Sequence, residues 1–353
     1  MKKTPHIWFI APFPPPLSGQ SQFNAMLRSH LDGVTQTYVL PTGGSAAGKI
    51  LRAIVNPLAV FMRVQRGDIV YTSAPGQLGL WLFLPTIAAL RLRRLGHFVH
   101  HHSYRAVNLA PMVVHRWLAR IGGQRQRHIF LCEKMRRGYV RAYLSPAQAE
   151  ASLVVPNAFF FAGALPPSPD RRGPIVVGHL SVMTREKGVD YILGLQRRLA
   201  GDSSLAFVLA GPIVDDGLRS EVEAAVAASK GQLRWIGPVI GADKAAFYAG
   251  VDLFLLPTRL VDEADPLVLL EAFGAGSRVL AADRGCIAER IGAPDDLLSL
   301  DPTADADCLR RTAAEIAVDR PAAVRACQAR ARALHDAAKI QGEAFLAALE
   351  GRS

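Results

Sequence analysis

Short apolar segments that end in Gly- or Pro-containing loops alternate with helix-patterned segments along the 353-residue chain. This alternation predicts parallel β-sheets covered by helices on both faces, the doubly wound α/β architecture. The pattern occurs twice, with HIWFIAP and GDIVYTSAP among the strand candidates of one half and IVVGHLSV and DLFLLPT among those of the other. Between the halves, the segment FFFAGALPPSPDRRGP is rich in Pro, Gly and charge, which predicts a linker.

We therefore expect two Rossmann-like domains, over residues 1–160 and 161–334, with a C-terminal helix at about 335–353 that packs back on the first. The length agrees, because single hydrophobic cores stop growing beyond roughly 250–300 residues. Two open α/β sheets in tandem place a cleft between the carboxyl ends of their strands, where such folds bind ligands. Functional residues are expected in the loops at those ends.

The sequence gives no indication of a membrane-spanning or secreted protein. The apolar run near the N-terminus is interrupted by prolines and is followed by no small-residue cleavage site. The longest apolar stretch, Leu78 to Leu90, contains Pro85 and is shorter than the roughly 20 residues that a spanning helix needs. The four cysteines lack the spacing of a structural zinc site. We expect a cytoplasmic protein without a bound metal.

The net charge of +11 is distributed unevenly along the chain. Residues 1–165 hold 19 Lys and Arg against four acids, a net charge of +15, whereas residues 166–353 carry a net charge of −4. A basic half of this kind indicates an anionic partner, such as nucleic acid, a phosphorylated substrate or an anionic membrane surface. Nucleic acid is disfavoured, because the basic half has no interleaved stacking aromatics and no recognisable binding module.

The most informative segment is DLFLLPTRLVDEADPLVLLEAFGAG, residues 252–276. A buried strand precedes an acidic loop that contains Glu263, and Pro266 opens a helix that carries Glu271. The free backbone N–H groups of Leu267 and Val268 at the start of this helix are suited to phosphate oxygens. Two glutamates eight residues apart are weak evidence alone, and their position around a helix start makes them candidates for binding a nucleotide.

The run from Glu263 to Glu271, followed by Ala272-Phe273, resembles the E-x7-E signature of family 4 retaining glycosyltransferases, which have the GT-B fold. The resemblance implies that Glu263 contacts the donor sugar and that Glu271 binds the nucleotide ribose. It also implies that the amides after Pro266 hold the diphosphate. The family's usual Gly-Phe after the first Glu is Ala264-Asp265 here, a departure that concerns the donor-sugar pocket.

The segment VVGHLSVMTREKGVDYIL, residues 176–193, predicts a strand, a loop and a helix that starts near Lys187-Gly188. A Lys there can neutralise a diphosphate, and a Gly allows close approach. The segment resembles the donor loop GRLxxxKG of the same family, in which an Arg and a Lys bind the leaving pyrophosphate. Here His179 occupies the usual Arg position, so that either Arg185 substitutes for the Arg or the second cation is missing.

Other strand ends supply further candidates. Gly211 in LAGP, and Pro238 with Val239 in WIGPV, occupy turns where the family binds the base. Gly19 lies in PPPLSGQ, which resembles the family's PPxxGG loop. His102 is the last histidine of the run HHHS, which resembles the family's HxH strand end near the donor sugar.

The resemblance implies a metal-independent, retaining hexosyltransferase that uses a UDP-sugar or GDP-sugar donor, with no tightly bound cofactor, in cell-surface polysaccharide or glycoconjugate synthesis. Lys187, Glu263 and His102 are the expected catalytic residues. The segments KILRAIVNPLAVFMRVQR and LWLFLPTIAALRLRRLG combine apolar faces with Arg, as interfacial helices do. We expect a glycan or lipid-linked acceptor and a peripheral location on the inner face of the plasma membrane. The alternative is that both segments are core helices.

Three other classes of protein are alternatives to a glycosyltransferase. A nucleotide-sugar epimerase shares the two-domain fold, although the first half lacks the catalytic acids expected of one. A dehydrogenase would carry GxGxxG after its first strand, which PPPLSGQ does not provide. A non-catalytic GT-B scaffold would tolerate loss of the Arg at position 179, and assay of donor hydrolysis separates it from an enzyme.

Overall fold

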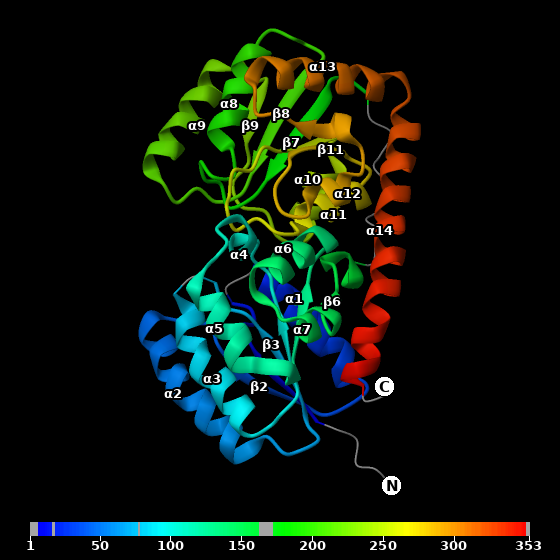
Figure 1. The fold of residues 1–353 in the computed structure, drawn as a ribbon. Helices are drawn as coiled ribbons and strands as arrows, with labels where there is room; N and C mark the ends of the chain where they lie inside the picture. The colour runs from blue at the N-terminus through cyan, green and yellow to red at the C-terminus, as the bar shows by residue number, and fades with distance from the viewer. Residues whose placement is uncertain (1–5, 16–17, 77, 162–171, 351–353) are drawn as a thin grey trace. The chain divides into compact units, whose positions relative to one another are not determined.

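The computed structural model describes residues 6–15, 18–76, 78–161 and 172–350. The chain divides into two compact units (Figure 1). The first unit comprises residues 1–160 and 337–353, and the second comprises residues 161–336. Most of the segment expected to form the linker lies outside the described residues.

The first unit is built on a parallel six-stranded sheet with the strand order β2-β1-β3-β4-β5-β6. Its strands are β1 (Ile7–Ala11), β2 (Thr37–Pro41), β3 (Ile69–Ser73), β4 (His97–His100), β5 (Gln126–Phe130) and β6 (Leu153–Val154). Its helices are α1 (Gly19–Asp32), α2 (Ala46–Arg63), α3 (Gly79–Leu92), α4 (Arg105–Asn108), α5 (Val113–Gly122), α6 (Glu133–Tyr143) and α7 (Pro146–Glu150). Strand β1 is buried along its whole length, as expected for a parallel sheet that helices cover on both faces.

The second unit repeats this architecture with a parallel sheet of order β12-β11-β10-β7-β8-β9. Its strands are β7 (Ile175–Leu180), β8 (Leu205–Ala210), β9 (Leu233–Trp235), β10 (Leu253–Leu256), β11 (Arg278–Ala282) and β12 (Leu297–Leu298). Its helices are α8 (Val189–Arg198), α9 (Asp216–Ala228), α10 (Gly241–Ala249), α11 (Leu267–Gly274), α12 (Ile287–Ile291) and α13 (Pro302–Val318). The prediction of two Rossmann-like doubly wound domains is confirmed.

The last helix, α14 (Arg320–Leu349), begins in the second unit, and its residues from Ala337 onward belong to the first. Phe345 is fully buried against the rings of Tyr71 and Phe98. Gly342 allows a close approach, because a Cβ there would lie 2.4 Å from the Phe159 ring. The C-terminal turns of α14 are therefore part of the core of the first unit.

The two segments that combine apolar residues with Arg fold differently. Helix α3 is a core helix, with Leu80, Phe83, Ile87 and Leu90 buried. Helix α2 buries little beyond Asn56, Ala59 and Val60, and most of its large apolar side chains are exposed. These exposed residues, which we call the α2 apolar face, are Ile50, Leu51, Ile54, Val55, Leu58, Phe61 and Met62.

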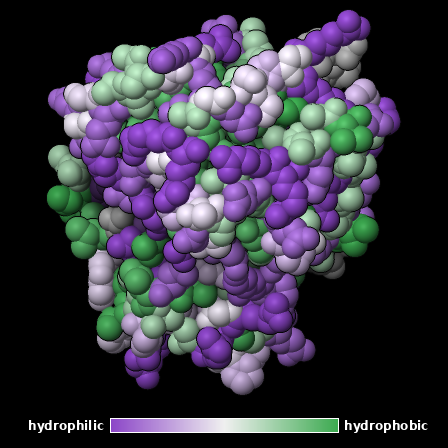
Figure 2. All heavy atoms as spheres, turned by 90° about the horizontal axis from the view of Figure 1, so that it is seen from above, coloured by the Kyte–Doolittle hydropathy of each residue, from purple (hydrophilic) through white to green (hydrophobic). Residues whose placement is uncertain are grey.

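The face of the molecule drawn in Figure 2 has a different character. Hydrophilic side chains cover much of its centre, and hydrophobic residues lie between them in small groups. Scattered apolar residues are normal on a protein surface, whereas seven on one helix are not. The α2 apolar face therefore needs an explanation that the face in Figure 2 does not.

Candidate functional site

Two of the predicted catalytic residues, Lys187 and Glu263, contact each other in the second domain. The Lys187 ammonium donates to Oε2 of Glu263 at 2.7 Å, and the hydroxyl of Thr258 donates to the same oxygen at 3.1 Å. Glu263 is almost fully buried, whereas Lys187 is about one-fifth exposed. The pair lies where β10 ends and α8 begins, so it places a cation and a carboxylate at the carboxyl edge of the sheet.

Gly188 holds this arrangement together through its backbone. Its φ of +83° lies in the left-handed region, and a Cβ there would lie 2.2 Å from the carbonyl oxygen of Pro257. The sequence predicted a Gly that lets the backbone approach a diphosphate. The close approach in the structure is to the end of β10, and it fixes Lys187 beside Thr258 and Glu263.

Gly211 has the same function on the neighbouring strand. Its φ is +123°, and a Cβ would lie 1.8 Å from the carbonyl oxygen of Ser181. Its N–H donates to Gly237, and its carbonyl accepts from the Trp235 indole. Gly211 therefore holds together the loops that follow β7, β8 and β9. Its partner in the loop after β9, Gly237, immediately precedes Pro238 and Val239. Base binding by these residues stays a prediction.

The second glutamate of the motif, Glu271, lies on α11 and is bonded to α10. Its Oε2 accepts from the Tyr248 hydroxyl at 2.8 Å, and its Oε1 accepts from the Lys244 ammonium at 2.5 Å. Burial and the nearby Glu271 carboxylate raise the pKa of Tyr248 well above its usual value. Tyr248 therefore stays a neutral donor that orients the carboxylate.

Sequence reasoning did not single out Lys244 or Tyr248. The available signal was their spacing of four residues in KAAFY, which places both side chains on one face of a helix. Nothing in that spacing indicates which residue the face contacts. The contact with Glu271 depends on the packing of α10 against α11.

The start of α11 lies between the two glutamates. Pro266 is the N-cap and has no N–H of its own, and no side chain caps the helix. Leu267 and Val268 are partly exposed, and the first turn contains no acidic residue. The free N–H groups and the positive end of the helix dipole can therefore accept an anion here.

A buried ion pair stabilises the loop that precedes α11. The guanidinium of Arg290 donates to Asp265 at 2.7 and 3.1 Å, and both side chains are buried. A Cβ at Gly285, whose φ is +59°, would lie 2.4 Å from the carbonyl oxygens of Glu263 and Ala264. Asp265, which departs from the family pattern, is thus a buried partner of Arg290 that helps to fix the Glu263 loop.

Neither candidate for the second diphosphate-binding cation lies in an obvious phosphate site. His179 is buried, its Nδ1 donates to the Leu255 carbonyl at 2.8 Å, and its Nε2 accepts from Ser181 at 2.8 Å. Burial lowers the pKa of His179 to about 4, so the ring is neutral at pH 7. Arg185 is exposed and paired with Glu221 of α9 at 2.5 Å. Its role toward a donor stays a prediction.

In the first domain, His102 follows β4 and packs against the rings of His100 and Phe23. Both of its ring nitrogens are buried and have no hydrogen-bond partner among the described residues. Burial lowers the pKa of His102 to about 3, so the ring is neutral at pH 7. Gly19 is the first residue of α1, which Ser18 caps, and Pro16 and Leu17 of the same loop lie outside the described residues.

Comparison with known proteins supports a glycosyltransferase. The family model described as "Glycosyl transferases group 1" matches residues 174–315, which lie in the second domain. No curated protein sequence matches the chain. The HepE protein of Anabaena, solved in complex with UDP, has a TM-score of 0.69 at 15% identity, with 98% of this chain and 100% of that chain covered. The chain has the GT-B fold.

Two further solved structures agree. WaaG, described as a glycosyltransferase involved in lipopolysaccharide biosynthesis, has a TM-score of 0.65 at 14% identity, covering 96% of each chain. The sucrose-phosphate synthase of Thermosynechococcus elongatus has a TM-score of 0.67 at 16% identity, covering 99% of this chain and 100% of that chain. At these identities the structures establish the fold, and the family model locates its glycosyltransferase signal in the second domain.

Among the described residues, no group of three or more His, Cys, Asp or Glu side chains could hold a metal ion. Within the same residues, none of the helices is both long enough and apolar enough to cross a membrane.

Proposed function

We propose that the protein is a retaining glycosyltransferase that takes its sugar from a UDP-sugar and binds the donor at the carboxyl edge of the second sheet. The observation that carries the proposal is the pairing of Lys187 with Glu263 and of Lys244 with Glu271 on either side of the α11 N-terminus. The nucleotide is chosen as UDP because HepE was solved with UDP and with UDP-glucose.

In this proposal the donor diphosphate replaces a carboxylate as the partner of Lys187. Phosphate oxygens bind the ammonium and the N–H groups of Leu267 and Val268, and sugar hydroxyls donate to Glu263. Charge develops on the departing diphosphate, so the cation and the helix start stabilise the transition state more than the bound donor. Glu271 accepts hydrogen bonds from the ribose, with Tyr248 and Lys244 holding it in place.

A panel of UDP- and GDP-sugars tests this function. We expect UDP-sugars to raise the melting temperature of the full chain, because a ligand that binds only the folded state stabilises it. We also expect slow release of UDP from the hydrolysed donor. Binding without any hydrolysis or transfer would favour the non-catalytic scaffold, and inversion at the sugar C4 would favour an epimerase. Stabilisation by GDP-sugars alone would mean that the base of the donor is guanine and not uracil.

We also propose that the first domain binds an anionic membrane surface and that the acceptor is a glycan or a lipid-linked glycan. Two features of the domain support this. Residues 1–165 carry a net charge of +15, and the α2 apolar face is exposed. Apolar residues that insert between lipids favour the membrane-bound state. Arg residues near an anionic leaflet also favour it, by about 1 kcal/mol each.

Vesicle sedimentation tests the membrane proposal. The full chain should sediment with anionic vesicles at low salt, detach as ionic strength rises, and bind neutral vesicles far less. Replacing Leu51 and Ile54 by Ser should weaken binding at every salt concentration, whereas the matched change of exposed Val214 and Ile240 in the second domain should not. Equal effects of the two pairs would contradict a membrane role for α2.

A further inference from the structure

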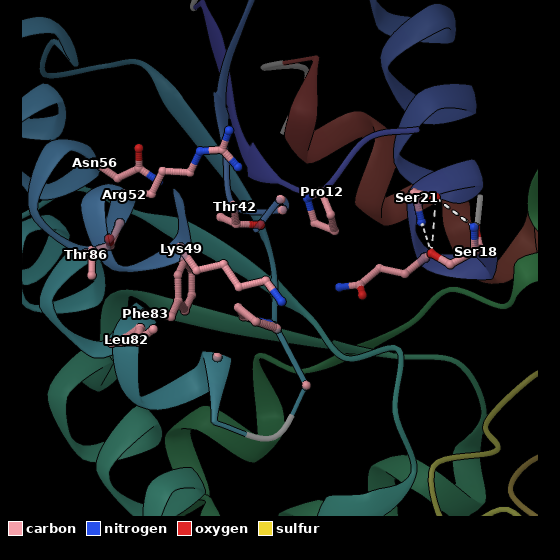
Figure 3. Close-up of a pocket in the computed structure, with 17 residues that line it drawn as sticks. Pro12, Ser18, Ser21, Thr42, Lys49, Arg52, Asn56, Leu82, Phe83 and Thr86 are labelled. Atoms are coloured by element: carbon pink, nitrogen blue, oxygen red, sulfur yellow. Dashed lines mark hydrogen bonds between the residues drawn. The ribbon is translucent and has the colours of Figure 1, made fainter. Parts of the chain in front are cut away.

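The first domain contains a pocket of about 340 Å³ that the proposed donor site does not use. Three loops at the carboxyl ends of β1, β2 and β3 form it, together with α2 and α3 (Figure 3). Its walls include apolar side chains, of which Phe83 and Leu82 come from α3, and hydroxyl and amide groups, of which Thr42 and Asn56 are examples. Ligands of doubly wound folds bind at this edge of the sheet.

Two cations of α2 line this pocket. Lys49 and Arg52 lie three residues apart, on one face of the helix, and Figure 3 shows the Lys49 ammonium directed toward the centre of the pocket. Arg52 lies over the glycine loop, because a Cβ at Gly44 would be 3.1 Å from its guanidinium. Among the described residues neither Lys49 nor Arg52 has an ion-pair partner, and the residues that line the pocket include no acid.

We propose that this pocket binds a phosphate or diphosphate group of the acceptor, through Lys49 and Arg52. The inference rests on the proposed function, because it takes the bound molecule to be the acceptor of sugar transfer. Two unpaired cations in a concave site without a carboxylate favour an anion, and guanidinium and ammonium groups are the usual protein partners of phosphate. The loop Thr42-Gly43-Gly44-Ser45, which leads into the α2 N-terminus, adds small residues that leave the backbone accessible.

The position of the pocket on α2 favours a lipid-linked phosphate over a soluble one. Lys49, Arg52 and Asn56 occupy the face of the helix that lines the pocket, whereas Ile50, Leu51 and Ile54 belong to the α2 apolar face. One helix therefore presents cations to a phosphate and apolar side chains to a bilayer. A phosphate attached to a lipid uses both surfaces at once, and a free sugar phosphate uses the first alone.

The test compares the double variant Lys49→Gln/Arg52→Gln with the matched double variant Arg63→Gln/Arg66→Gln. The second pair removes the same charge from exposed positions at the end of α2, outside the pocket. Both pairs are placed in the full chain carrying Lys187→Ala, so that the donor site contributes less to binding of pyrophosphate. Inorganic pyrophosphate and farnesyl diphosphate in neutral vesicles are the two probes, and calorimetry or cosedimentation measures their affinity.

We expect the Lys49/Arg52 variant to lose about 10-fold or more in affinity for both probes, and the Arg63/Arg66 variant to change by less than about 3-fold. Farnesyl diphosphate binding more tightly than pyrophosphate would support a lipid-linked acceptor. Equal affinities would support a soluble phosphorylated one. Unchanged affinities in the Lys49/Arg52 variant, with an unchanged melting temperature, would overturn the assignment of the pocket.

UDP affinity of the two double variants, measured without Lys187→Ala, separates this inference from the proposed function. Intact UDP binding with pyrophosphate affinity independent of Lys49 and Arg52 contradicts the pocket alone. Absence of UDP binding in every form of the chain, with pyrophosphate affinity still dependent on Lys49 and Arg52, contradicts the glycosyltransferase assignment alone.

Discussion

The two domains share one architecture and differ in the chemistry at the edges of their sheets. Each is a parallel six-stranded sheet with helices on both faces. In the second domain, buried acids form ion pairs with cations, as in Lys187–Glu263 and Arg290–Asp265. The first carries unpaired cations at its pocket, an exposed apolar helix and a group of buried histidines. A shared fold therefore determines where the sites lie, and the loop residues determine what each binds.

The largest expected difference between the domains is their response to acid. Burial lowers the pKa of His102 and His128 to about 3 and that of His97 and His115 to about 4, all in the first domain. Such histidines bind protons more readily in the unfolded chain, at a pKa of about 6.5. Their stabilising effect is complete above pH 6.5 and is lost as the pH falls toward 4, by about 2 kcal/mol each at pH 5.

Amide hydrogen exchange between pH 7.5 and pH 5 measures this difference. Protection factors in β4 and β5 should fall by several orders of magnitude more than those in β7 and β8, where His179 is the one comparable histidine among the described residues with a resolved shift. Equal losses in both sheets, or an earlier loss in the second, would show that the buried histidines do not control acid stability.

The second expected effect is on catalysis. Lys187→Ala should lower turnover by about 100-fold or more, because removing one preorganised donor from a developing anion costs about 2.7–4 kcal/mol. Lys230→Ala, at an exposed position after α9, is the control and should leave turnover unchanged. Steady-state assays of UDP release decide, and turnover within 3-fold of normal would remove Lys187 from the mechanism.

A pair of glycines sharpens the comparison through the backbone. Gly188 and Gly67 both have positive φ, and only at Gly188 would a Cβ meet another backbone, at 2.2 Å from Pro257. Gly67→Ala should lower the stability of the first domain by about 1 kcal/mol, through the conformational cost of a positive φ alone. Gly188→Ala adds a steric clash and should destabilise the second domain by roughly 1–3 kcal/mol more. Chemical denaturation of both variants measures the difference, and equal values would mean that the loop moves freely away from Pro257.

The smallest expected effect is that of Arg185→Ala. Its exposed pair with Glu221 contributes little to stability, because water screens it. Turnover should fall less than in Lys187→Ala if Arg185 remains with Glu221 in the donor complex. A loss as large as that of Lys187→Ala, together with normal activity of Glu221→Ala, would instead assign Arg185 the role of the second diphosphate-binding cation.

The sequence was sufficient to predict the two doubly wound domains, because apolar segments and helical spacing repeat at every element. It also located the strand ends that bring Lys187, Glu263 and Glu271 to one edge of a sheet. It could not predict that Glu263 accepts from Lys187 or that Tyr248 orients Glu271, because those contacts depend on how the loops and helices pack. Periodicity likewise did not distinguish the buried α3 from the exposed α2, since both segments mix apolar residues with Arg.

The pocket beside Lys49 was missed for a related reason. Lys49 and Arg52 belong to a segment whose apolar residues indicated a membrane-binding helix. That both side chains line one pocket depends on the packing of α2 beside the loops after β1 and β3, which the sequence does not show. His179 shows the converse case. Its position in the motif made it a candidate cation, and burial between Leu255 and Ser181 makes it neutral.

Calorimetric titration of the full chain with UDP tests the central claim, that the second domain binds a nucleotide at the α11 edge, most directly. We predict saturable UDP binding that Glu271→Ala weakens by about 1.5–3 kcal/mol, through loss of a charged hydrogen-bond partner. The control Glu315→Ala removes an exposed glutamate of α13 that is paired with Arg278, and it should leave the UDP affinity unchanged. Absence of UDP binding by the unaltered chain, or equal affinities in all three proteins, would contradict it.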